Sequence, residues 1–107
     1  MNLPFPIQTY FDADNRNDGE ALIQVFAPDA VGRDENRSHA GHLAIAAWWR
    51  EVKLKYGQVT EPLAVAEKDA VTSVCARVTG HFPGSPATLN FAFRLKGDQI
   101  TSLEIGA

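Results

Sequence analysis

Apolar residues recur every three or four positions in the first half of the chain and at every second position in the last half. The helical spacing is clearest after residue 41, where one face collects large apolar side chains: Ile45, Trp48, Trp49, Val52 and Tyr56. This pattern predicts a long helix that ends at Gly57, which can adopt the left-handed conformation of a C-cap. A short strand over residues 30–35 is predicted to place Asp34 at its end, before a polar loop over residues 36–41.

Two shorter helices are expected before that strand. Pro6 suits the first turn of a helix, where the missing amide proton costs no hydrogen bond, and apolar spacing extends this helix over residues 6–15. Asp18 is a suitable N-cap for a second, short helix. The second helix is expected to direct three apolar side chains inward: Leu22, Val25 and Phe26. Residues 28–29 are predicted as the turn into the strand.

Beyond residue 57 the alternation of apolar and polar residues is typical of strands. Strands are predicted over residues 58–67, 70–82, 87–96 and 99–105, with turns of hairpin length between them. Helices early and antiparallel strands late predict an α+β fold, in one domain over residues 1–107. The side chains expected toward the helices are Val74, Ala76, Val78, Phe91, Phe93 and Leu95. Those expected on the outer sheet face are Cys75, Arg77, Thr79, His81, Asn90, Ala92 and Arg94.

Composition and charge argue against several classes of protein. The chain is 45% hydrophobic and 21% charged, which is ordinary for a globular domain. Its net charge of −3 and the absence of a basic run argue against a nucleic-acid partner. No segment approaches the ~20 apolar residues that cross a bilayer, and the first residues predict no signal peptide. The single cysteine, Cys75, fits a reducing compartment, so we expect a cytoplasmic protein with no membrane partner.

Three short motifs follow one another along the helical half of the chain. They are Tyr10-Phe11-Asp12-Ala13-Asp14-Asn15 with Asp18, then Phe26-Ala27-Pro28-Asp29-Ala30-Val31, and Gly41 before Ala44-Ile45. Their order and spacing resemble the nuclear-transport-factor-2-like superfamily, and the resemblance covers nearly the whole chain. It implies a cone of three N-terminal helices packed on a curved, mostly antiparallel sheet. Within the superfamily the chain resembles the small bacterial proteins called SnoaL-like.

Ketosteroid isomerase is the superfamily member that allows a comparison of single residues. The resemblance implies that Tyr10 matches its oxyanion hydrogen-bond donor. Asp34 matches its general base, since both aspartates lie eight residues after the phenylalanine of a Phe-Ala-x-Asp-Ala run. Trp48 matches an apolar pocket position. Counting back from Phe93, however, places Phe91 where the isomerase has a second donor, a protonated aspartic acid. A phenyl ring donates no hydrogen bond, so the resemblance implies an incomplete oxyanion hole.

The residues themselves leave alternatives open at the candidate site. Apolar walls raise the pKa of a carboxyl group by desolvation, which would suit Asp34 to act as a general base. Alternatively, Asp34 caps the following loop or pairs with Arg37. Tyr10 either donates a hydrogen bond to a ligand or packs as a core residue. Asp14 lies one helical turn after Tyr10, where it either forms a carboxylate pair with Asp34 or is solvated. The apolar residues expected to contact a ligand are Trp48, in preference to Trp49, with Phe91, Phe93 and Val74.

Other reactive side chains lack supporting motifs. His39 and His42 flank Gly41, but no His-x-x-x-His pattern or cysteine accompanies them, so no metal or other cofactor is expected. Cys75 has no identifiable catalytic partner. Ser85 lies in the turn over residues 83–86 without a nucleophile-elbow motif, so a Ser-His-Asp hydrolase has no support.

Three functions from different classes fit these features. The first is an enzyme of isomerase, dehydratase or hydrolase type that acts on a small apolar molecule, with Asp34 as general base and Tyr10 as hydrogen-bond donor. The second is a non-catalytic ligand-binding module that uses the same pocket. The third is a dimerisation domain with a vestigial cavity. A homodimer through the outer sheet face is expected, because that face mixes small and amphipathic side chains.

Overall fold

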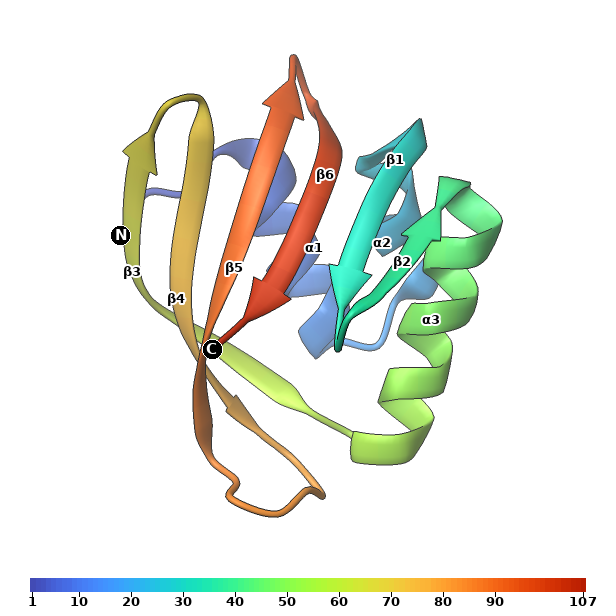
Figure 1. Ribbon diagram of the computed structural model, residues 1–107, viewed down its shortest axis with the longest axis vertical. Coiled ribbons are helices and arrows are strands. Elements are labelled where there is room, and N and C mark those ends of the chain that lie inside the picture. Colours follow the sequence, from blue (N-terminus) through green and yellow to red (C-terminus); the bar gives the residue numbers. More distant parts are fainter.

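The apolar stripes and alternating segments of the sequence form three helices packed on one six-stranded sheet in the computed structural model, which describes residues 1–107 (Figure 1). The helices are α1 (Phe5–Asn15), α2 (Gly19–Gln24) and α3 (Gly41–Tyr56). The strands are β1 (Phe26–Asp34), β2 (Arg37–Ala40), β3 (Val59–Lys68), β4 (Val71–Thr79), β5 (Ala87–Lys96) and β6 (Gln99–Gly106). The sheet order is β2-β1-β6-β5-β4-β3, and only β1 and β6 pair in parallel. The predicted α+β cone with a mostly antiparallel sheet is confirmed.

Local signals in the sequence set the ends of the helices. Pro6 lies in the first turn of α1, as expected. The Asp18 carboxylate accepts a hydrogen bond from the Ala21 backbone N–H at 3.1 Å and thereby caps α2. Gly57 ends α3 in the left-handed conformation, with φ 54°, and its N–H donates to the Lys53 carbonyl. None of the three helices has the length and apolar character of a membrane-spanning segment.

The first two strands differ from the sequence prediction. Residues 28–29 were expected as a turn, but β1 starts at Phe26 and passes through them with a register shift against β6. Residues 36–41 were expected as a loop, but Arg37–Ala40 pairs with β1 as strand β2. Glu35 and Asn36 form the connection, both with positive φ, and such two-residue turns match the twist of a hairpin. The apolar pattern missed β2 because this edge strand is largely exposed and has no buried alternation.

The core lies between the helices and the inner face of the sheet. The alternation predicted for β4 and β5 is observed, since Val74, Ala76, Val78, Phe91 and Phe93 are all buried. β4 ends at Thr79, three residues earlier than predicted, so His81 and Phe82 belong to the following loop.

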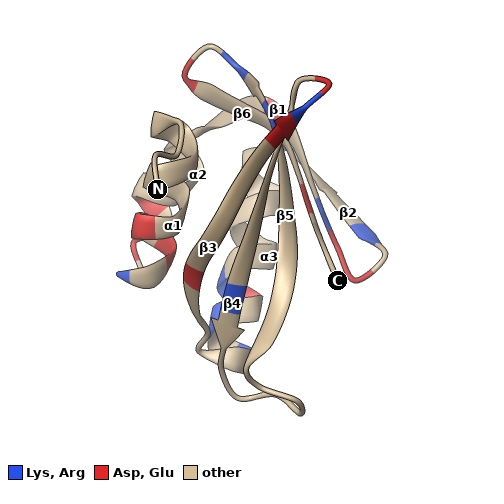
Figure 2. Cartoon of the chain, turned by 90° about the vertical axis from the view of Figure 1, so that its left-hand side faces the viewer, with Lys and Arg blue, Asp and Glu red and all other residues tan.

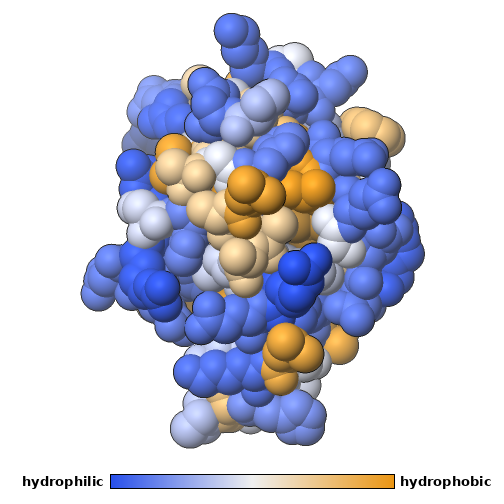
Figure 3. Space-filling view, turned by 90° about the vertical axis from the view of Figure 1, so that its right-hand side faces the viewer, coloured by the Kyte–Doolittle hydropathy of each residue, from blue (hydrophilic) through white to orange (hydrophobic).

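The side of α3 that faces away from the core carries two exposed leucines, Leu43 and Leu54. Figure 3 shows apolar groups on this side set among hydrophilic residues.

Candidate ligand pocket

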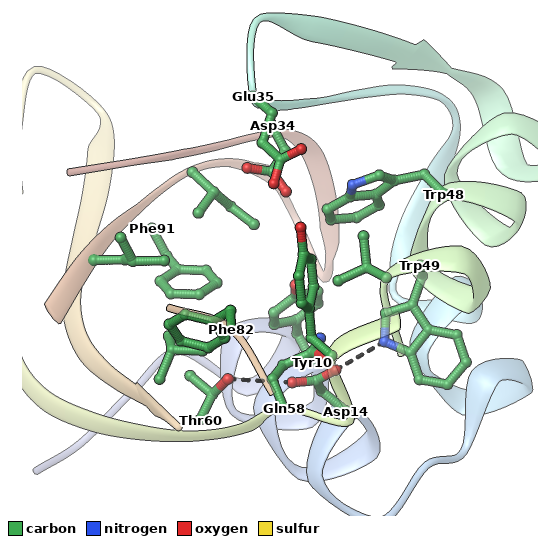
Figure 4. Close-up of a pocket in the computed structure, with 15 residues that line it drawn as sticks. Tyr10, Asp14, Asp34, Glu35, Trp48, Trp49, Gln58, Thr60, Phe82 and Phe91 are labelled. Atoms are coloured by element: carbon green, nitrogen blue, oxygen red, sulfur yellow. Dashed lines mark hydrogen bonds between the residues drawn. The ribbon is translucent and has the colours of Figure 1, made fainter. Parts of the chain in front are cut away.

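A cavity of about 190 Å³ lies between α1, α3 and the inner face of the sheet (Figure 4). Ten of its fifteen lining residues are hydrophobic. Its apolar wall consists of Val52, Tyr56, Val78, Phe82, Leu89, Phe91 and Ile105, together with the two tryptophans. An engineered cavity of about 150 Å³ binds benzene, whereas pockets for drug-sized ligands exceed about 300 Å³. The enclosed space therefore suits a molecule with about one ring.

One end of the cavity carries the carboxyl group of Asp34. β1 ends at this residue, just before the turn that contains Glu35. Figure 4 shows both carboxyl groups facing the Tyr10 hydroxyl, with the indole nitrogen of Trp48 directed toward Asp34. Burial raises the pKa of Asp34, and the neighbouring charge of Glu35 adds to the shift. Hydrogen bonding to the ionised form, from the Trp48 indole and the Glu35 backbone, opposes it. Asp34 is thus a partly desolvated carboxyl group with raised proton affinity, as a general base requires.

Tyr10 lies at the middle of the cavity lining, with a buried ring and a hydroxyl group that has no hydrogen-bond partner. The residue is 3% exposed, and its ring packs edge-to-face on those of Phe11, Phe26 and Phe93, at centroid distances of 5.2, 6.0 and 5.5 Å. Its hydroxyl points toward Asp34 and makes no hydrogen bond to any lining residue (Figure 4). Burial raises the pKa of Tyr10 well above its usual value, so the hydroxyl remains a donor at neutral pH.

The opposite end of the cavity is closed by a network around Asp14. Its carboxylate accepts hydrogen bonds from the Trp49 indole N–H at 2.8 Å and the Thr60 hydroxyl at 3.4 Å. The Lys53 ammonium lies 3.3 Å from the same carboxylate. Asp14 is 3% exposed, so the solvated alternative does not hold, and its oxygens are occupied by groups of the protein. The two aspartates line one cavity but lie at opposite ends of it (Figure 4).

The structure brings some of the expected contact residues together and not others. Trp48 and Phe91 line the cavity, and so does Trp49. Phe93 and Val74 are fully buried but do not line it. Phe93 packs edge-to-face with the Tyr10 ring, with centroids 5.5 Å apart, and Val74 pairs with Phe91 within the sheet. Phe91 lines the cavity with its ring centroid 6.4 Å from that of Tyr10, so β5 places a phenyl ring and no carboxylic acid beside Tyr10.

Sequence reasoning missed several lining residues. Phe82 comes from the loop after β4 and packs edge-on against Tyr56 at 5.8 Å. A large aromatic residue directly before Pro83-Gly84 was the available signal that this loop folds inward. Three polar residues, Glu35, Gln58 and Thr60, also line the cavity.

The histidines have other contacts. The His39 ring stacks on Trp48 with centroids 5.6 Å apart, behind the cavity. His42 Nε2 lies 2.7 Å from the Phe26 carbonyl oxygen. No group of three or more His, Cys, Asp or Glu side chains is arranged to hold a metal ion. Neither histidine lines the cavity.

Several known proteins resemble this chain in sequence or in fold. The family model for the SnoaL-like domain matches residues 7–103. A candidate polyketide cyclase from Sinorhizobium meliloti is 46% identical, with a TM-score of 0.93 over 96% of this chain and 94% of that one. A protein with a ketosteroid isomerase-like fold from Catenulispora acidiphila, solved with trimethylamine, has a TM-score of 0.85 and 18% identity, over 99% and 87% of the two chains.

A candidate polyketide cyclase from Xanthomonas campestris has a TM-score of 0.71 and 20% identity, over 94% and 85% of the two chains. The two likenesses below 25% identity concern the fold alone. A search of curated proteins finds no match. The resemblance deduced from the helical motifs is confirmed by the family match and the structural neighbours. The chain belongs to the SnoaL-like domain family.

Proposed function

We propose that this protein is an enzyme that moves a proton on a small apolar carbonyl compound. The Asp34 carboxylate removes a proton from the carbon next to the carbonyl group, and the bonding electrons pass to the carbonyl oxygen as an enolate forms. Tyr10 donates its hydroxyl proton in a hydrogen bond to that oxygen. The observation that carries the proposal is that a carboxyl group with a raised pKa and a buried tyrosine with a free hydroxyl face each other in one apolar cavity.

The fate of the enolate decides the reaction type. When a double bond lies beside the α-carbon, return of the proton from Asp34 to the γ-carbon gives isomerisation. When the β-carbon carries a hydroxyl group, the enolate expels it and Asp34 returns the proton to the leaving oxygen, so water is lost. When the enolate carbon attacks a second carbonyl, a ring closes and the new alkoxide takes the proton from Asp34, which fits the 46% identity to a candidate polyketide cyclase. Because Phe91 supplies no second donor, the oxyanion relies on Tyr10, and a single such donor contributes about 10²–10³ in kcat.

Proton exchange in deuterium oxide tests this proposal directly. Cyclohex-3-enone fits a cavity of about 190 Å³, and its conversion to the conjugated cyclohex-2-enone is followed by ultraviolet absorbance. We expect the native protein to accelerate α-proton exchange and this conversion above the buffer rate. A β,γ-unsaturated ketosteroid should not be converted, because its ring system exceeds the cavity.

Two variants and one control variant test the roles of Asp34 and Tyr10 separately. Asp34→Asn should abolish exchange, and Tyr10→Phe should lower it by about 10²–10³-fold. Glu67→Gln, an exposed carboxylate on β3 outside the cavity, should have no effect. Exchange that survives Asp34→Asn would rule out the general base. Binding of the ketone with no exchange above buffer would favour the alternative function, a non-catalytic ligand-binding module.

A further inference from the structure

The end of the cavity that carries Asp34 has an excess of negative charge. Three carboxylates line the cavity, those of Asp14, Asp34 and Glu35. The only buried cation nearby, Lys53, is 3.3 Å from Asp14 at the opposite end and also donates to the Gln58 carbonyl at 2.6 Å. Asp34 and Glu35 make no salt bridge, and the charge of Glu35 adds to the raised pKa of Asp34. This end of the cavity therefore carries two carboxylates that make no salt bridge, although Arg33 and Arg37 lie beside them in the adjoining surface groove and Lys55 is near enough for Glu35 to raise its pKa.

The walls beside these carboxylates are aromatic. Six aromatic side chains line the cavity: Tyr10, Trp48, Trp49, Tyr56, Phe82 and Phe91. Aromatic rings attract cations through their negative faces, and sets of them recognise alkylated ammonium groups. The chain already makes one such contact at this wall, because the exposed Lys55 ammonium lies 5.1 Å from the centroid of the Tyr56 ring. Its pKa is raised through its contact with Tyr56, and the charge of Glu35 adds to this shift.

Tyr10 adds an independent indication that a ligand binds at this end. It is 3% exposed, yet its hydroxyl has no hydrogen-bond partner in the cavity and points toward the two carboxyl groups. The hydroxyl oxygen is accessible from the cavity, so it is free to donate a hydrogen bond to a ligand or to water there. The free Tyr10 hydroxyl, the Asp34 and Glu35 carboxylates and the aromatic side chains thus line the same small cavity.

We propose that the ligand of this cavity carries a small alkylated ammonium group, which lies between the Asp34 and Glu35 carboxylates and the aromatic wall, with a polar atom of the ligand bonded to the Tyr10 hydroxyl. This deepens the proposed function, since it makes the carbonyl substrate an amine-bearing one. A neutral ligand at this end leaves the partly buried Asp34 carboxylate desolvated without compensation and should bind more weakly than a cation, whereas an anionic ligand is repelled; the Glu35 side chain is exposed and contributes its charge at the mouth of the cavity. A cation compensates both charges, and the volume of about 190 Å³ limits it to a few carbon atoms.

Three probes of similar size test the proposal by calorimetry, and the first two are isosteres that differ only in the charge of the quaternary centre. They are choline, the neutral 3,3-dimethylbutan-1-ol and the anionic 3,3-dimethylbutanoate. We expect choline to bind about tenfold or more tightly than the alcohol at pH 7, and the acid to bind least. Failure of choline to bind at millimolar concentration, or an alcohol that binds as tightly as choline, would overturn the proposal.

The pH dependence of choline affinity is a second measurement, and a purely apolar pocket would not show it. Protonation of Asp34 removes one of the two charges, so choline should bind more weakly as the pH falls from 7 toward the Asp34 pKa, which burial raises. The alcohol should bind equally well or more tightly over the same range. The other charged or titratable groups around Asp34 are Glu35 in the turn, Tyr10 from α1, His39 behind Trp48, and Arg33 and Arg37 in the adjoining groove, while Lys53 pairs with Asp14 at the opposite end. Any positive charge gained by His39 would also repel choline, so it acts in the same direction as protonation of Asp34.

One variant identifies the anionic side chain without touching the proposed base. Glu35→Gln should lower choline affinity about tenfold and leave the alcohol unchanged, whereas Glu67→Gln on β3 should alter neither. An unchanged ratio of choline to alcohol affinity in Glu35→Gln would also overturn the proposal. These affinities require no turnover, so they can fail while Asp34-dependent proton exchange succeeds, and the reverse also holds.

Discussion

At the scale of single residues, the Asp34 carboxyl binds its proton more tightly in the folded chain than in the unfolded chain. Burial raises its pKa, so its ionisation opposes folding, and this cost appears as the pH rises through the unfolded and then the folded pKa. Asp34→Asn removes the cost and should leave the Tm at pH 7 unchanged or higher. Near about pH 3, where the carboxyl is protonated in both states, the advantage should disappear.

Thermal unfolding followed by circular dichroism at both pH values checks this sign. The Glu67→Gln protein serves as control, because its carboxylate is exposed on β3. A loss of several degrees at pH 7 in Asp34→Asn would show instead that Asp34 caps the turn at Glu35 and Asn36, and the catalytic assignment would fail.

In Tyr10 the ring contributes to packing and the hydroxyl group does not, so the contribution of the hydroxyl to stability can be tested separately. Tyr10→Phe keeps the edge-to-face packing on Phe11, Phe26 and Phe93 and removes a hydroxyl that makes no hydrogen bond in the cavity. The free energy of unfolding should therefore change by no more than about 0.5 kcal/mol, as measured by urea titration. A destabilisation of about 2 kcal/mol would show that the hydroxyl has a structural partner.

At the scale of elements, the Asp14 network joins α1, α3 and β3 across the floor of the cavity. Removal of one member of a buried ion pair leaves the other charge uncompensated and costs about 3–5 kcal/mol. Asp14→Ala should approach that loss, because it also leaves the Trp49 indole N–H and the Thr60 hydroxyl without their acceptor. Lys53→Met should cost less, since those two hydrogen bonds remain. Urea unfolding with the double variant as control measures the coupling, and additive losses would show that the pair is not coupled.

Elements with a strong apolar period could be predicted from the sequence, and elements held by exposed backbone pairing could not. The α3 stripe and the alternation of β4 and β5 predict inward faces directly, and most of these residues are buried, whereas Val52, Tyr56 and Leu95 are half-buried. β2 lacks such a face, and its hairpin depends on Glu35 and Asn36 in left-handed conformations that their residue types do not demand.

In the candidate site, residues identified by local spacing or by the family motif could be predicted, whereas contacts between residues far apart in the sequence could not. Helical spacing places Asp14 on the face of Tyr10, and the family motif singles out Asp34, so both could be located from sequence. The partners of Asp14 lie 35 to 46 residues further along the chain, in α3 and β3. No local pattern pairs side chains at such a separation, so the burial of Asp14 could not be predicted.

At the scale of the whole molecule, the helices cover one face of the sheet and leave the other uncovered. Figure 2 shows that charged residues gather mainly in the hairpins and helices, with few along β3, β4 and β5. One exposed pair lies there, Arg77 and Glu61, whose side chains are 2.8 Å apart. The register places small side chains along the middle of this face: Ala64, Ala66, Ser73, Cys75, Asn90 and Ala92.

We expect two copies of the chain to pair through this outer sheet face. Its small side chains allow two sheets to approach closely, and Glu61 neutralises Arg77, which removes one of the two repulsions expected between like arginines across a two-fold axis. Sedimentation at micromolar concentration should give a mass about twice 11.7 kDa. Ala92→Arg places a charge near the centre of the face and should give the monomer, whereas Leu54→Arg, on the outer face of α3, should leave the dimer intact. A native monomer, or a dimer broken by Leu54→Arg and not by Ala92→Arg, would place the interface elsewhere or exclude it.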